Sequence, residues 1–142
     1  MFLSPARYLY ACAIMLEMIR RTKAGDAIWI SGEEMHKLLK QSGSWSMTQG
    51  VMRRLSDVGL LGWNPGRGFS LPPDFEEFSL LDVLKACFCK SDRDKEASDF
   101  LQDNWLMRLH QVDVPDELLG ILDDSQKELY QRLADVKLVS LA

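Results

Sequence analysis

Residues 31–71 contain two short helical segments followed by two strand-like segments around a glycine-rich turn. The first helix is predicted to begin at Ser31, because a serine followed three positions later by Glu34 forms a capping box, in which each side chain satisfies an unpaired backbone amide. We expect this helix to end near Ser42. Its expected core residues are Met35, Leu38 and Leu39. Two capped helices followed directly by a hairpin restrict the chain to a small set of folds.

The second helix is predicted to begin at Ser46, since Gln49 stands three positions later in the same capping pattern. It should end at Gly59, because glycine readily adopts the left-handed conformation that terminates a helix. At about 100° per residue, its apolar residues fall within one quarter of the circumference and form a core face. These residues are Met47, Val51, Leu55 and Val58. The opposite face carries Ser46, Gln49, Gly50, Arg53, Ser56 and Asp57.

Residues 60–63 and 69–71 are predicted to be strands, and residues 64–68 between them have the proline and glycines of a tight turn. Upstream, Pro5 should begin a helix, and residues 27–30 read as a short strand able to pair with the hairpin. The expected core stripe of this first helix is Leu9, Cys12, Ala13, Leu16 and Ile19. Three helices and a small antiparallel sheet predict a mainly α winged helix-turn-helix with a β-hairpin wing.

Further helices are predicted after the wing. Ser79 and Asp82 form a third capping box, which opens a helix carrying Leu80, Val83, Leu84, Cys87 and Phe88. Residues 91–95 read as a linker, residues 97–109 as an amphipathic helix, and Pro115 as the start of a short one. A last helix is expected to carry Leu122, Leu129, Tyr130, Leu133 and Val136. The apolar tail after it should pack against this domain or a second subunit.

Charge divides the chain into two halves. Residues 1–71 hold nine Lys and Arg against five Asp and Glu, whereas residues 72–142 hold eight against sixteen. The helix-turn-helix half is therefore basic although the net charge of the chain is −4. A local positive surface is what favours nucleic acid, because phosphate contacts supply most non-specific affinity. An acidic tail without any such partner is the alternative reading.

The outer face of the second helix suits base recognition. Gln49 and Arg53 are one turn apart, and these side chains pair bidentately with adenine and guanine in the major groove. An ordinary solvated surface explains them equally well. Gly50 between them either is tolerated or permits close approach to DNA, and Trp45 should pack in the turn or lie against a sugar edge. The candidate DNA-binding residues are Ser44, Ser46, Gln49, Gly50, Arg53, Arg67, Arg7 and Tyr8.

The order of elements resembles the Rrf-two family of bacterial winged-helix regulators, which includes repressors that respond to iron–sulfur clusters, cysteine metabolism and nitric oxide. The matching stretches are residues 4–8, 55–61, 66–71, 78–86 and 133–138. The resemblance implies a homodimeric, sequence-specific DNA-binding repressor. This chain departs from the family in its shorter wing, where Arg67 stands between two glycines, and in lacking three spaced cysteines after the wing helix.

The cysteines and histidines do not form a pattern typical of a cofactor site or an enzyme. Cys87 and Cys89 would point about 200° apart on a helix and would not converge on one metal. We expect Cys87 to be a buried small apolar residue and Cys89 to be a surface thiol. A redox role is the alternative for Cys89. His36 and His110 have no nucleophile or metal-ligand spacing around them, and His110 should end a helix. We therefore predict no cofactor, no metal and no enzymatic activity.

We expect two regions, a DNA-binding domain over residues 1–90 and a helical dimerisation or sensing region over residues 91–142. Three cysteines, no apparent membrane span and no export leader favour a cytoplasmic protein. The recognition helices of a homodimer, residues 46–58, would enter successive major grooves of double-stranded DNA. The expected dimer residues are Leu129, Tyr130, Leu133 and Val136. The alternatives are a winged-helix protein-interaction module without DNA binding and an iron–sulfur or thiol redox sensor.

Overall fold

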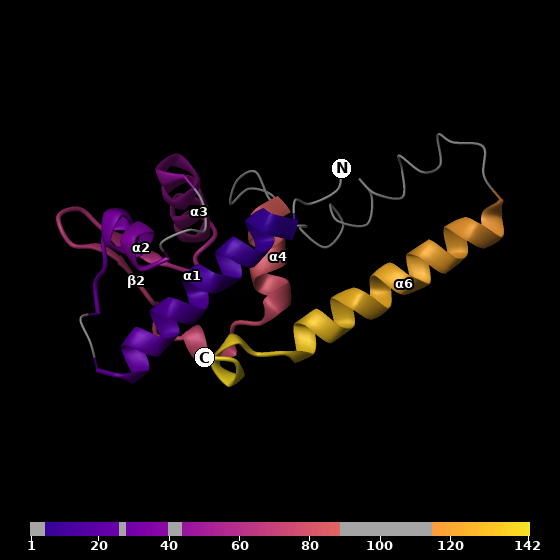
Figure 1. Cartoon of the computed structure of the whole chain (residues 1–142). Helices are drawn as coiled ribbons and strands as arrows, with labels where there is room; N and C mark the ends of the chain where they lie inside the picture. Colours follow the sequence, from indigo (N-terminus) through magenta and orange to yellow (C-terminus); the bar gives the residue numbers. More distant parts are fainter. Residues whose placement is uncertain (1–4, 26–27, 40–43, 89–114) are drawn as a thin grey trace.

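The computed structural model describes residues 5–25, 28–39, 44–88 and 115–142, and these are mainly helical with one small hairpin (Figure 1). The helices are α1 (Pro5–Lys23), α2 (Gly32–Leu38), α3 (Trp45–Asp57), α4 (Leu80–Phe88) and α6 (Asp116–Asp135), with the short 3-10 helices η1 (Phe75–Glu77) and η2 (Leu138–Ser140). The hairpin consists of β1 (Gly62–Asn64) and β2 (Gly68–Ser70). This arrangement confirms the predicted winged helix-turn-helix followed by C-terminal helices.

Helix α1 supplies much of the hydrophobic core, together with α3 and α4. Of its predicted stripe, Cys12 and Ile19 are buried, and Ala13 and Leu16 are half-buried. The prediction is wrong at Leu9, which is 65% exposed. Most of the circumference of α1 is apolar, so two neighbouring apolar stripes could each face the core. The stripe that was not predicted is the more deeply buried. Its buried residues are Tyr10, Ala11, Ile14, Met15 and Met18.

Helix α2 begins at the predicted cap and ends earlier than expected. The amide of Glu34 donates to Ser31 Oγ at 3.1 Å, while the Ser31 hydroxyl, and not its amide, donates to the Glu34 carboxylate at 3.4 Å. The helix ends at Leu38, four residues before Ser42, and Ser42 itself lies outside the described residues. Leu38 is 43% exposed and is therefore wrong as a core residue. Met35 is fully buried and Leu39, the C-cap of the helix, is half-buried against the core, as predicted for both residues.

Helix α3 begins two residues earlier than predicted. The cap is Ser44, whose Oγ accepts from the amide of Met47 at 3.1 Å, and Ser46 lies exposed in the first turn. Val51 and Leu55 are buried as predicted. The core face is wider than the apolar pattern indicated, since it also includes Thr48 and Met52.

The exit from α3 is confirmed at Gly59, which has a φ of +86°. The amide of Gly59 donates to the carbonyl of Ser56 at 3.1 Å, and the amide of Leu60 donates to that of Leu55 at 2.9 Å. These two bonds form a Schellman motif, which satisfies carbonyls at the end of the helix and turns the chain toward the wing.

The wing is a three-residue antiparallel pair in the register Gly62↔Ser70, Trp63↔Phe69 and Asn64↔Gly68. Ile30 pairs with Phe69 through two backbone hydrogen bonds of 2.9 and 2.7 Å. The strand predicted over residues 27–30 is thus a single bridge at Ile30, and residue 27 lies outside the described residues. This bridge attaches the wing to the chain that enters α2.

The segment after the wing opens α4 with the predicted capping box. The Ser79 amide donates to Asp82 Oδ2 at 2.8 Å, and the Asp82 amide donates to Ser79 Oγ at 3.2 Å. Val83 and Leu84 are buried, whereas Leu80 and Cys87 are half-buried. The predicted linker at 91–95, the helix at 97–109, Cys89, His110 and the side chain of Phe88 lie outside the described residues.

Helix α6 corrects the prediction of two C-terminal helices. Pro115 is the N-cap of one helix of 20 residues, which extends away from the other elements (Figure 1). The chain then returns to the domain, where the Leu80 amide donates to the carbonyl of Val136 at 3.0 Å and the Leu138 amide donates to that of Phe78 at 2.9 Å. Leu138 is fully buried, so the apolar tail packs against its own domain.

Candidate nucleic-acid interface

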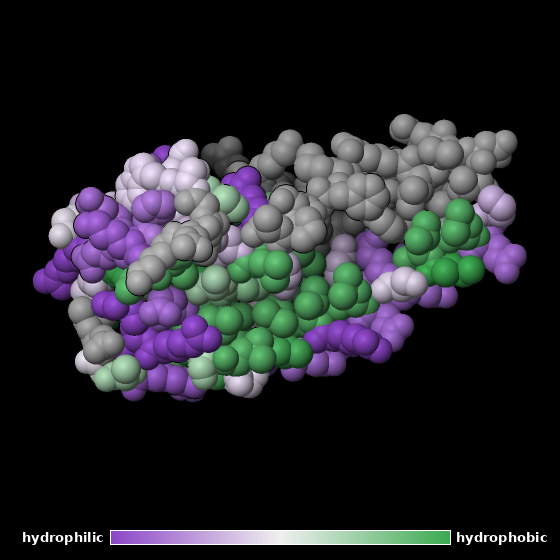
Figure 2. Space-filling view, in the orientation of Figure 1, coloured by the Kyte–Doolittle hydropathy of each residue, from purple (hydrophilic) through white to green (hydrophobic). Residues whose placement is uncertain are grey.

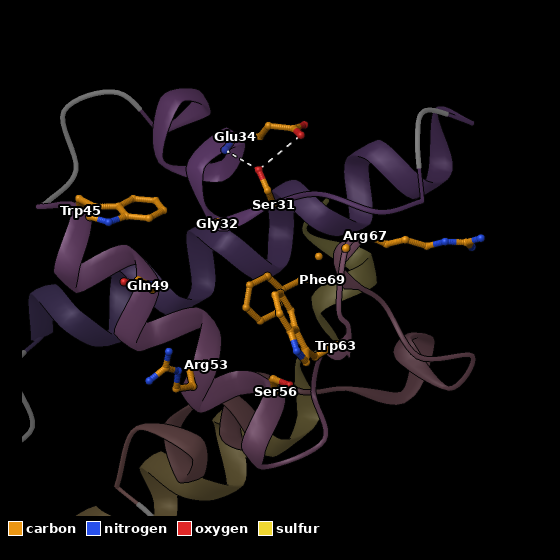
Figure 3. Close-up of a pocket in the computed structure, with 12 residues that line it drawn as sticks. Ser31, Gly32, Glu34, Trp45, Gln49, Arg53, Ser56, Trp63, Arg67 and Phe69 are labelled. Atoms are coloured by element: carbon orange, nitrogen blue, oxygen red, sulfur yellow. Dashed lines mark hydrogen bonds between the residues drawn. The ribbon is translucent and has the colours of Figure 1, made fainter.

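A groove of about 520 Å³ lies between the start of α2, the outer face of α3 and the wing (Figure 3). Helix α3 contributes Gln49 and Arg53 to it, and the wing contributes Trp63, Arg67 and Phe69. Sequence reasoning had selected Gln49, Arg53 and Arg67, so the structure brings three of the predicted residues to one groove.

The two arginines at this groove lie on different elements, Arg53 on α3 and Arg67 in the wing. Neither Arg53 nor Arg67 forms an ion pair or a hydrogen bond with any described residue. By contrast, the neighbouring Arg54 donates its Nε–H to the carbonyl of Ala86 at 3.0 Å and ties α3 to α4. Glu34 is the acidic residue of the described lining. The described residues at the groove thus include two arginines without a partner among them and one carboxylate, a balance that favours an anionic partner.

The other predicted DNA-binding residues do not line the groove. Ser44 caps α3, and Ser46 is exposed beside it. Gly50 is exposed, and a Cβ added to it would meet nothing within 4 Å, so the fold itself does not require glycine there.

Arg7 and Tyr8 lie on the first turns of α1, which packs against α4. Arg7 is exposed, whereas the Tyr8 hydroxyl donates to the carbonyl of Leu80 at 2.8 Å. Burial raises the pKa of this hydroxyl above its usual range. Tyr8 therefore has a structural bond that joins α1 to the start of α4.

Sequence reasoning missed the aromatic floor of the groove. Trp63 is 57% exposed, and its ring lies against that of Phe69 with the centroids 4.7 Å apart. The two residues are directly opposite each other in the hairpin. The sequence does place one aromatic residue on each side of the turn. This placement could have predicted the contact, because aromatic pairs on opposite strands stabilise a hairpin.

A buried polar network positions α3 behind the groove. The hydroxyl of Thr48, which is fully buried, forms hydrogen bonds with the Tyr10 hydroxyl and, at 3.0 Å, with His36 Nδ1. The three side chains come from α3, α1 and α2. Because a buried polar group is costly when unpaired, this network favours one orientation of the three helices.

Trp45 lies at one end of the groove. It packs against α2 residues, but it is the first residue of α3 and does not stand in the turn, where it was predicted. Its ring makes an edge contact with His36, with centroids 5.7 Å apart, and lies over Gly32. It is 43% exposed and is one of the residues that line the groove.

The two cysteines that the structure describes are not activated thiols. Cys12 is buried and Cys87 is half-buried, and burial raises the pKa of both, to about 11 for Cys87. Thiols with raised pKa values are protonated at neutral pH and react slowly. Within the described ranges, no three His, Cys, Asp or Glu residues cluster as metal ligands.

A second exposed surface runs along α6. The apolar residues Leu118, Ile121 and Leu129 are 42%, 56% and 52% exposed, and Figure 2 shows hydrophobic surface along this helix. Of the predicted dimer residues, Leu129 is therefore open, while Tyr130, Leu133 and Val136 are half-buried.

No protein-family model matches the chain, and a search of the curated proteins finds no match. Among the helices that the structure describes, none is both long and apolar enough to cross a membrane.

Proposed function

We propose that this protein is a sequence-specific DNA-binding transcriptional regulator that acts as a homodimeric repressor. The observation that carries the proposal is a pair of arginines at one groove of a winged helix-turn-helix, Arg53 on α3 and Arg67 on the wing, which have no partner among the described residues. Phosphates and base edges are the partners that such arginines bind in this fold. The basic half of the chain holds this groove.

Helix α3 is the recognition helix in this proposal. Gln49 and Arg53 are exposed, one turn apart, and their amide and guanidinium groups match the edges of adenine and guanine. The hydrogen bonds of Thr48 hold the buried side of the helix, and Ser44 caps its N-terminus. A helix that reads bases needs such rigid support.

The homodimer is proposed to form through α6. Leu118, Ile121 and Leu129 expose apolar surface on a helix that extends from the domain, and a second copy of the same helix would bury it. Two recognition helices would then enter successive major grooves, as in other dimeric helix-turn-helix proteins.

Selection of bound sequences from random duplexes, followed by gel-shift titration, tests the proposal. We expect a palindrome, and we expect Arg53→Ala to weaken binding to it by ~1–3 kcal/mol, the value of one bidentate base contact. Arg20→Ala is the matched control, because Arg20 is an exposed arginine paired with Glu17 on α1. Equal affinity of Arg53→Ala and the wild type would rule out base recognition by Arg53.

A protein-interaction module without DNA binding is the second candidate, and the exposed apolar face of α6 is the observation that favours it. Retention on DNA resin at several salt concentrations separates the two. A protein that neutralises several phosphates binds tightly at low salt and loses affinity steeply as salt rises. Absence of retention even at low salt would support the module.

A further inference from the structure

Trp63 stands between the two arginines of the groove. In Figure 3, Trp63 and Phe69 lie between Arg53 on α3 and Arg67, whose side chain extends from the wing away from that helix. Trp63 is 57% exposed, and among the described residues its indole N–H has no hydrogen-bond acceptor. Within the described part of the chain, Trp63 is thus a large apolar ring with an unused donor, placed between two arginine positions that have no partner there.

The ring is held on a rigid support. Phe69 beneath it is 8% exposed and bonds to Ile30 through both its amide and its carbonyl. The hairpin also passes close to the chain at Ile30, because a Cβ added to Gly68 would lie 2.4 Å from the carbonyl oxygen of Ile30. The backbone of Trp63 is therefore held in place by its pairing with Phe69, and its ring already contacts Phe69, which lowers the entropy cost of using it in a contact.

The geometry of duplex DNA determines what faces Trp63, if the protein binds DNA as proposed above. Each strand's sugar–phosphate backbone separates the major groove, about 12 Å wide, from the minor groove, about 6 Å wide. A recognition helix in the major groove and a wing in the adjacent minor groove must therefore stand on either side of one backbone. The surface between α3 and the wing, where Trp63 lies, then faces that strand.

We propose that Trp63 packs its ring against a deoxyribose of the strand that passes between α3 and the wing, and donates its indole N–H to a phosphate oxygen of the same strand. A deoxyribose presents an apolar face beside an anionic acceptor, which matches an indole ring and its N–H. Arg53 and Arg67 on either side supply the charge that attracts the strand. Trp63 thus adds affinity and fixes the register of the protein on DNA without reading its sequence.

The test compares Trp63→Ala with Trp63→Phe by fluorescence anisotropy on the selected palindrome and on an unrelated duplex. Trp63→Ala should weaken binding to both duplexes about tenfold and equally, since a sugar contact carries no sequence information. Trp63→Phe keeps an aromatic ring but loses the donor, so it should lose about threefold. Leu141→Ala is the control, because Leu141 is a 48% exposed apolar residue at the C-terminal tail, and its affinity should equal that of the wild type.

The dependence of affinity on salt separates Trp63 from the arginines. Because Trp63 neutralises no phosphate, Trp63→Ala should leave the slope of log affinity against log salt unchanged, whereas Arg67→Ala should reduce it by about one. DNA should also protect the tryptophan fluorescence from acrylamide in the wild type, and this protection should be smaller in Trp63→Phe.

The outcomes distinguish this inference from the proposed function. If Arg53→Ala weakens specific binding while both Trp63 variants bind like the wild type, the Trp63 contact is refuted and the DNA-binding function stands. A loss confined to the palindrome would mean that Trp63 contacts bases, and tighter binding to single-stranded than to duplex DNA would mean base stacking. Both results overturn the sugar contact. A wild-type protein that binds no duplex at all overturns the inference and the proposed function together.

Discussion

At the scale of single residues, the start of helix α3 was ambiguous in the sequence, and contacts with distant residues accompany the start that the structure shows. Ser44 and Ser46 are two positions apart, and either serine has the side chain that an N-cap requires. The cap at Ser44 brings Thr48 into the first turns, where its hydroxyl donates to the Ser44 carbonyl at 3.2 Å and also meets Tyr10 and His36. These contacts join residues up to 38 positions apart, so no local pattern reports them.

The two serines give a prediction at this scale. Ser44→Ala should destabilise the protein by about 1 kcal/mol, because the Met47 amide loses its acceptor, whereas Ser46→Ala should change stability little. Urea unfolding followed by circular dichroism measures both. A greater loss in Ser46→Ala than in Ser44→Ala would contradict the observed start of α3.

At the scale of elements, the wing depends on its glycines for different reasons. Gly66 and Gly68 both have positive φ, at +86° and +106°. A Cβ on Gly66 would meet nothing within 4 Å, whereas one on Gly68 would collide with the carbonyl of Ile30. The turn chemistry of residues 64–68 was readable from the sequence. The close approach at Gly68 was not, because it depends on the bridge between Ile30 and Phe69.

This contrast gives a prediction for the wing. Gly66→Ala should cost about 1 kcal/mol, the strain of a left-handed alanine. Gly68→Ala should cost more, because the bridge to Ile30 must also move. Thermal unfolding of the two variants measures the difference, and equal losses would show that the Ile30 contact does not constrain the hairpin.

At the scale of the whole molecule, the C-terminal tail couples α6 to the winged helix. Leu138 is buried, its amide bonds to Phe78, and the Lys23 ammonium donates to the carbonyl of Val139 at 3.0 Å. The end of α6 is thus anchored to α1 and to the start of α4, which both pack against α3. In the proposed dimer, this coupling would fix the spacing of the two recognition helices.

The apolar face of α6 gives a prediction for assembly. Leu129→Glu should convert the proposed dimer into a monomer, because it places a charge in the surface that a second α6 would cover. Light scattering gives the mass, and unchanged circular dichroism would show that the monomer is folded. Leu38→Glu is the control, since Leu38 is 43% exposed on α2, and it should remain dimeric. A dimeric Leu129→Glu would place the interface elsewhere.

The sequence by itself determined the order of elements from α1 to α4, the helix caps at Ser31 and Ser79, the glycine exit of α3 and the turn of the wing. Each of these depends on hydrogen bonds or backbone preferences within a few residues, so short patterns report them. Only the tertiary structure decided which stripe of α1 is buried and which serine caps α3. It also decided that Trp63 stands exposed between Arg53 and Arg67. Those choices depend on packing between elements far apart in the chain, where burial and complete hydrogen bonding outweigh local preference.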